Sequence, residues 1–236
     1  METNPIPDEQ KQLYRNPTVA ANYDKLRFSS FVGRFIGRSE TRIVLEFLTR
    51  AKDLHTVLDA PCGTARLEKA VVCRNSKMKF VGIDVSVNQI QFGRLKLEDA
   101  HLHKQVEFVN CDIEQLPFRD GSFDAAVCMR LTGHLAPDLR VSIIRELARA
   151  VRKFVIVEYH DPTSAKGVWR ALVALTGWKR FPWFPLDAPH ALREMRDAGL
   201  HDFAIMRILG RIAESYFVFG RKDESIQEEH IMRVSE

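Results

Sequence analysis

Several features that define common protein classes are missing from this sequence of 236 residues. Its four cysteines, Cys62, Cys73, Cys111 and Cys128, form no Cys-x-x-Cys pair, so their spacing indicates neither a zinc site nor a redox motif. No uncharged apolar run approaches the ~18 residues that a membrane-spanning helix needs. A concentrated basic stripe is also missing, and a net charge of +4 argues against nucleic acid as a partner.

The composition that is present belongs to an ordinary globular protein, with 45% apolar and 28% charged residues. The chain opens with the polar stretch METNPIPDEQ, which does not have the pattern of a secretory signal. We therefore expect reduced cysteines and a cytoplasmic location, with a peripheral contact to a membrane left open.

Short β-rich runs alternate with helical patterns through the middle of the chain. The β-rich runs cover residues 55–59, 80–84, 106–111, 123–129 and 154–159, and the helical patterns cover 67–74, 88–101 and 139–151. Such alternation predicts a parallel sheet with helices on both faces. After a helix at 190–198, two β-rich runs at 202–209 and 214–221 are so close that they must form an antiparallel hairpin. We predict an α/β fold with a seven-stranded, mostly parallel, doubly wound sheet and a C-terminal antiparallel hairpin.

This pattern divides the chain into three parts. Residues 1–50 form an N-terminal arm followed by two lid helices, which are separated by a loop at 29–33. Residues 51–221 form the main domain, with an insertion at 161–189. Residues 222–236 form a polar tail.

Three acidic residues stand at the ends of three successive predicted strands: Asp59, Asp84 and Asp112. Asp59 precedes a tight turn, in which Gly63 lets the backbone approach a ligand without a Cβ in the way. Asp84 ends the next strand, where a carboxylate can accept bonds from both hydroxyls of a ribose. Asp112 is placed to contact the exocyclic amine of adenine. The carboxyl ends of parallel strands meet at one sheet edge, so we expect a nucleoside-containing cofactor there.

Four motifs in order carry a resemblance to a known family: VLDAPCGTAR, VGIDVS, NCDIEQLPF and GSFDAAVCMR. They resemble the motifs of class I, Rossmann-like methyltransferases, in the small-molecule branch near the quinone-ring methyltransferases. The resemblance implies S-adenosyl-L-methionine as the cofactor. It also implies methyl transfer to a small-molecule acceptor, an aromatic or apolar hydroxyl or carbon.

The same resemblance implies roles for individual residues. The methionine part of the cofactor is lined by Asp59, Gly63 and Thr64, with Ala60 also in the site, and is flanked at its end by Met129 and Arg130. The ribose is held by Asp84, with Val85 against the adenine and with Asp112 and Ile113 at the adenine edge. On the lid helices, Tyr23 is expected near the methyl group and Arg38 near the cofactor carboxylate.

The turn after the first strand departs from the family pattern, acid-x-Gly-x-Gly-x-Gly. The first glycine is Pro61 here and the third is Ala65, a position that serves close helix packing. These departures keep open an alternative, a non-catalytic cofactor-binding subunit with the methyltransferase fold. A nicotinamide-dependent oxidoreductase is disfavoured, because its loop needs G-x-G-x-x-G and only Gly63 is present.

The acceptor side is less defined by the sequence. His134, in MRLTGHL after the fourth strand, is the candidate general base, and His160 is a second candidate. A purely local role is the alternative for each histidine. The stretch MRLTGHL also lacks the N-P-P-Y-type tetrapeptide used for amide nitrogens, which argues against a protein or nucleic-acid acceptor.

The insertion at 161–189 contains all three tryptophans, Trp169, Trp178 and Trp183. We favour a lid that closes over a flat or apolar acceptor. A weak membrane-surface contact through residues 166–184, or an ordinary packed helix and loop, are the alternatives. The oligomeric state is left open by the sequence.

Overall fold

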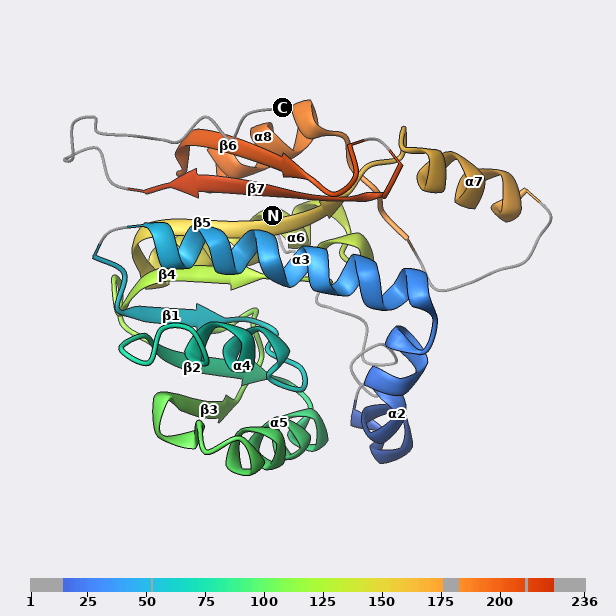
Figure 1. Ribbon diagram of the computed structural model, residues 1–236. Coiled ribbons are helices and arrows are strands. Elements are labelled where there is room, and N and C mark those ends of the chain that lie inside the picture. Colours follow the sequence, from blue (N-terminus) through green and yellow to red (C-terminus); the bar gives the residue numbers. More distant parts are fainter. Residues whose placement is uncertain (1–14, 52, 176–182, 211, 223–236) are drawn as a thin grey trace.

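A computed structural model describes residues 15–51, 53–175, 183–210 and 212–222. Within these ranges, one seven-stranded sheet has the order β3-β2-β1-β4-β5-β7-β6 (Figure 1). Its strands are β1 (Thr56–Asp59), β2 (Lys79–Asp84), β3 (Val106–Asn110), β4 (Phe123–Cys128), β5 (Val151–His160), β6 (His201–Arg207) and β7 (Ser215–Arg221). Strand β7 is antiparallel to β5 and β6, and the other neighbours pair in parallel. The predicted fold class is therefore confirmed.

Helices cover both faces of this sheet. The α-helices in the described residues are α2 (Pro17–Phe28), α3 (Phe31–Arg50), α4 (Arg66–Val72), α5 (Val87–Asp99), α6 (Pro137–Ala150), α7 (Ala165–Ala174) and α8 (Ala188–Asp197). Apolar side chains of α6 and α8 pack on one face, and those of α3, α4 and α5 pack on the other. Two short 3-10 helices, η1 (His103–Gln105) and η2 (Thr132–His134), lie in the connections.

Strand β4 shows how the sequence produces this layering. All of its six residues are buried, as expected for a strand covered on both faces. Ala126 and Cys128 join the core under α6 and α8, whereas Ala125 and Val127 join the core under α3 and α4. The alternation follows from the two-residue period of a strand. Both cores meet on the central strands, which holds the carboxyl edge of the sheet in place.

The predicted boundaries hold to within a few residues, and β5 differs most. Its prediction began at residue 154, but the strand begins at Val151, directly after α6. Arg152 and Lys153 interrupt the apolar run, so composition alone gives no strand there. The structure pairs Val151 with Phe123 of β4, and backbone pairing therefore decides the start.

The strand order reverses between β1 and β4, which are neighbours in the sheet. In open α/β sheets, such a reversal leaves a crevice outside the carboxyl ends of the strands. Helix α2 and the first half of α3 lie beyond this edge (Figure 1). Among helices in the ranges given above, none has both the length and the apolar character to cross a membrane.

Candidate active site

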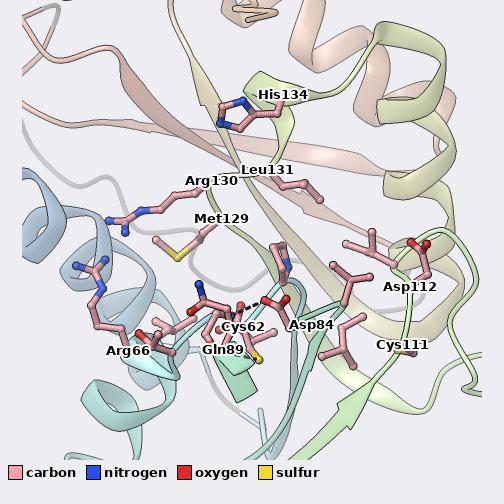
Figure 2. A pocket seen from close by; sticks show the side chains of 18 of the residues that line it. Cys62, Arg66, Asp84, Gln89, Cys111, Asp112, Met129, Arg130, Leu131 and His134 are labelled. Carbon is pink, nitrogen blue, oxygen red and sulfur yellow. Dashed lines mark hydrogen bonds between the residues drawn. The ribbon is translucent and has the colours of Figure 1, made fainter. Parts of the chain in front are cut away.

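A cavity opens at the carboxyl edge of β1, β2, β3 and β4, and most of the predicted cofactor residues line it. Those that do are Asp59, Gly63, Thr64, Asp84, Val85, Asp112, Ile113, Met129 and Arg130, together with the candidate base His134. In Figure 2, Arg66 and Arg130 lie toward one end of the cavity and Asp112 toward the other, with Asp84 between them. One cavity thus brings together residues from four strand ends.

Two predicted cofactor residues lie outside the lining of this cavity, and the side chain of a third is not described. Ala60 is fully buried and does not line the cavity. Arg38 is exposed on α3 and does not line it either, whereas Thr41 of the same helix does. Tyr23 belongs to α2, but its side chain lies outside what the structure describes.

The turn after β1 forms although two family glycines are replaced. The N–H of Ala60 donates to Val127 O (2.9 Å) and that of Cys62 to Ile83 O (2.8 Å), which ties the turn to both neighbouring strands. Gly63 has φ 53° and Ala65 has φ 56°, so both are left-handed. Glycine takes this conformation at no steric cost, whereas alanine does not. Ala65 therefore adopts this conformation at a steric cost, while the hydrogen bonds to β2 and β4 are kept.

Ala65, at the third glycine position of the family pattern, faces Gly93 of α5. A Cβ added at Gly93 of α5 would lie 3.0 Å from the Cβ of Ala65, a tighter contact than most Cβ atoms make. Gly93 therefore gives the space that Ala65 occupies, and α5 still packs closely on the turn.

Asp84 closes β2 and fixes the turn. Its two carboxylate oxygens accept from the backbone N–H groups of Gly63 (3.0 Å) and Ser86 (2.8 Å). Burial raises the pKa of Asp84 to about 6, and these two hydrogen bonds oppose the rise. Each carboxylate oxygen has a further lone pair, so Asp84 can still accept bonds from a ligand.

Asp59 faces a second buried acid, Glu68, which the sequence analysis did not single out. Both side chains are almost fully buried, and the two carboxyl groups interact. Burial raises the pKa of Asp59 well above its usual range, with the charge of Glu68 as the next cause. Burial also raises the pKa of Glu68 to about 7. The pair therefore holds a proton readily. When the two carboxyl groups share one proton, the negative charge that remains can attract a cationic group.

Two arginines form the opposite end of the cavity. Arg130 pairs with buried Glu40 of α3, and Arg66 lies 3.8 Å from the same carboxylate. The ring of Phe28 lies under both guanidinium groups, with its centroid 4.2 Å from Arg66 and 4.9 Å from Arg130. Gly37 of α3 makes room for Phe28, since a Cβ there would meet the ring at 2.5 Å. These contacts give the cavity a basic end.

Helix α2 is attached to the glycine turn. The Thr64 hydroxyl donates to both carboxylate oxygens of Asp24 (3.0 Å each), and Lys96 of α5 pairs with the same carboxylate. Asp24 itself lines the cavity. These contacts hold α2 against the turn, and its role as a lid helix stays a prediction.

One tryptophan ring, that of Trp183, packs against both candidate histidines. His134 ends η2 and lines the cavity, and His160 ends β5 outside it. The ring of Trp183 packs edge-on against both, at 5.2 Å from His134 and 4.5 Å from His160. His160 also lies 3.8 Å from the buried carboxylate of Glu158.

The tryptophans of the insertion have different surroundings. Trp183 points inward, with Arg170 of α7 over its ring at 4.0 Å. Trp169 lies on α7 and is 59% exposed. Trp178 falls outside the described residues, as do the arm before residue 15 and the tail after Lys222. The two described tryptophans of the insertion thus differ in burial, and a lid function of the insertion stays a prediction.

Several cavity residues were missed by the sequence analysis, notably Asp24, Arg66 and Gln89. Arg66 ends the quoted motif VLDAPCGTAR, so its place at the start of α4 was a usable signal. Asp24 and Gln89 carry no motif. Only the packing of α2 and α5 against the turn brings them to the cavity.

Comparison with known proteins identifies the domain. Residues 57–153 match a family model described as a methyltransferase domain. The chain is 32% identical over 111 residues to a demethylmenaquinone methyltransferase of Porphyromonas gingivalis, covering 45% of this chain and 43% of that protein. It is 32% identical over 150 residues to a demethylmenaquinone methyltransferase of Bacillus cereus, covering 61% and 60%. The matches thus span less than two thirds of either relative.

Solved structures support the same fold. Magnesium protoporphyrin IX methyltransferase of Synechocystis, with bound SAH, has a TM-score of 0.75 at 15% identity, covering 92% of this chain and 99% of that one. Geranyl diphosphate C-methyltransferase of Streptomyces coelicolor has a TM-score of 0.60 at 15% identity, covering 79% and 76%. The resemblance to class I methyltransferases is confirmed: residues 57–153 match a methyltransferase domain, and the whole sheet has the fold of these solved structures.

Proposed function

We propose that this protein binds S-adenosyl-L-methionine in the cavity at the carboxyl edge and transfers its methyl group to a small-molecule acceptor. The observation that carries the proposal is the convergence of Asp59, Asp84 and Asp112 on one cavity beside the glycine turn. The matched methyltransferase domain, residues 57–153, contains all three.

The residues present fit this cofactor. One oxygen of Asp59 is buried and accepts no hydrogen bond from any described residue, which suits an ammonium group. Asp84 offers two acceptor oxygens for the ribose hydroxyls, and Asp112 lies at the far side of the cavity for the adenine. Arg66 and Arg130 suit the carboxylate of the methionine part. When bound, S-adenosylmethionine supplies an electrophilic methyl group on its sulfonium.

The chain itself then has three tasks. The acids and arginines hold the cofactor, and α2 limits the access of water through the contact of Asp24 with Thr64. His134 faces the cavity and accepts the proton that the acceptor hydroxyl or acidic carbon loses. Trp183 packs against the imidazole and holds its ring in place.

For the acceptor, we propose an aromatic or apolar compound of the quinone class, which bears a ring hydroxyl or carbon. Support comes from the relatives named as demethylmenaquinone methyltransferases and from the aromatic wall that Trp183 forms beside His134. The alternative of a non-catalytic subunit rested on Pro61 and Ala65. The turn at those residues keeps its hydrogen bonds to β2 and β4, so no described contact favours that alternative.

Calorimetry with S-adenosylhomocysteine and with NAD tests the cofactor. We expect binding of the first and none of the second. A methyl-transfer assay with a panel of hydroxylated quinones and phenols then tests activity. Cofactor binding without turnover on any of these acceptors would favour the non-catalytic alternative.

A further inference from the structure

Exposed apolar side chains are concentrated at one edge of this molecule. Of the thirteen large apolar side chains that are exposed among the described residues, ten belong to the start of α3, to α7 with the segment after it, and to the β6–β7 turn. These ten are Phe31, Val32, Phe35, Val168, Trp169, Leu172, Leu175, Phe184, Leu209 and Ile212.

The topology puts all three segments at the carboxyl edge, where the cavity opens. Helix α7 follows the carboxyl end of β5, and the β6–β7 turn follows that of β6, which runs parallel to β5. The turn joins α7 through Lys166 N–H, which donates to Ile212 O (3.4 Å). The start of α3 is fixed to this edge by Phe28 and Glu40, which contact Arg130 after β4. In Figure 1, α7 and the start of α3 both extend beyond the sheet at this side.

Helix α7 is unusual for a helix of a globular protein, because it buries none of its residues. Val168, Trp169, Leu172 and Leu175 recur at helical spacing and are 48–83% exposed. An apolar stripe left in solvent from Val168 to Leu175 marks a contact with something outside the described fold.

The charges of these segments indicate which kind of partner covers the apolar stripe. Residues 31–38 and 165–175 include four basic residues, Arg34, Arg38, Lys166 and Arg170, and no acidic residue. Lys166 and Arg170 both pair with Glu214, which is buried beneath them, so one of their two positive charges is not offset. A second copy of the chain would bring basic residues against basic residues. A bilayer with anionic headgroups instead accepts both the cations and the apolar stripe.

We propose that the start of α3, α7 and the β6–β7 turn form a surface that docks on anionic lipid bilayers. The apolar side chains enter the boundary between headgroups and acyl chains, and the arginines and lysine remain among the headgroups. The cavity then opens toward the bilayer. This inference goes beyond methyl transfer and does not depend on it, since docking needs neither cofactor nor acceptor.

Vesicle flotation of the full chain tests the proposal. We expect binding to vesicles of phosphatidylcholine with phosphatidylglycerol, weak binding to phosphatidylcholine alone, and release at high salt. Leu172→Ser should weaken binding about tenfold, because one buried leucine is lost. Leu95→Ser is the matched control: Leu95 is 56% exposed on α5, against 59% for Leu172, but lies away from the surface. It should bind as the native chain does.

A second variant tests the contribution of α3. Phe35→Ser, at a 44% exposed position of α3, should also weaken binding, and all three variants should keep the native melting temperature. The proposal is overturned if the anionic vesicles do not bind the chain, or if Leu172→Ser and Leu95→Ser bind alike. It is also overturned if the chain sediments as a dimer that Leu172→Ser dissociates, because a second copy then covers the surface.

Discussion

Asp84 allows the sharpest test of the cofactor site, through the substitution Asp84→Asn. The carboxylate accepts Gly63 N–H and Ser86 N–H, one on each oxygen. Asparagine has one oxygen and one NH₂ group, so it keeps one of these bonds, turns a donor toward the other N–H, and loses the charge. The ribose then loses at least one hydrogen bond to a charged acceptor. Such a bond is worth roughly 1.5–3 kcal/mol, so affinity for S-adenosylhomocysteine should fall roughly 10- to 150-fold.

The pH dependence gives an independent measure of the same residue. Burial raises the pKa of Asp84 from 3.8 to about 6, so the carboxylate is ionised above that pH and is lost as the pH falls through it. The affinity of the native protein should therefore fall below about pH 6, and that part of the dependence should be missing in Asp84→Asn.

Calorimetry at several pH values is the assay, and Asp112→Asn is the control. Asp112 is less buried than Asp84 and uses one oxygen for Glu114 N–H (3.2 Å), so its substitution should reduce affinity less than about tenfold. A native melting temperature must accompany each measurement. An Asp84→Asn variant that is folded and binds the cofactor product as tightly as the native chain would refute the ribose assignment.

Three further predictions follow from the contacts described. His134→Ala should lower turnover by roughly 10²–10⁴ with little change in cofactor affinity, and full turnover at neutral pH would remove its role as base. Arg140→Lys should lower the melting temperature, because buried Arg140 forms two bonds to Glu194 (2.6 and 2.7 Å) that lysine cannot reproduce; an unchanged melting curve would contradict this. Burial raises the pKa of Glu68 from 4.5 to about 7, so the folded chain keeps a proton that the unfolded chain releases, and stability should fall as the pH rises across that range. Glu68→Gln should remove part of this fall in thermal melts, and an identical pH profile would count against it.

The acids at the strand ends could be predicted because their roles follow from chain order. Asp59, Asp84 and Asp112 each come after an apolar run, and parallel strands bring such ends together whatever the details of packing. The basic end of the cavity could be predicted only in part. The motifs include Arg130 and Arg66, but only the packing of α3 against the sheet places Glu40 beside both of them while Arg38 remains exposed. The partner of Ala65 was likewise hidden, because Gly93 is 28 residues away in the sequence.

The order of the strands separates the tasks of the site along one edge. Strands β3, β2 and β1 carry the acids for the cofactor, and β4 and β5 carry the histidines and, beyond them, α7. An apolar acceptor that arrives from a bilayer would therefore meet α7 and Trp183 first and His134 next, with the cofactor residues behind. Trp183 lies between α7 and the histidines, because its ring contacts Arg170 of α7 as well as His134 and His160. Trp183→Ala should accordingly reduce turnover on an apolar acceptor and leave both vesicle binding and cofactor affinity unchanged. Loss of cofactor affinity in that variant would show instead that Trp183 supports the fold of the cavity and not the passage of the acceptor.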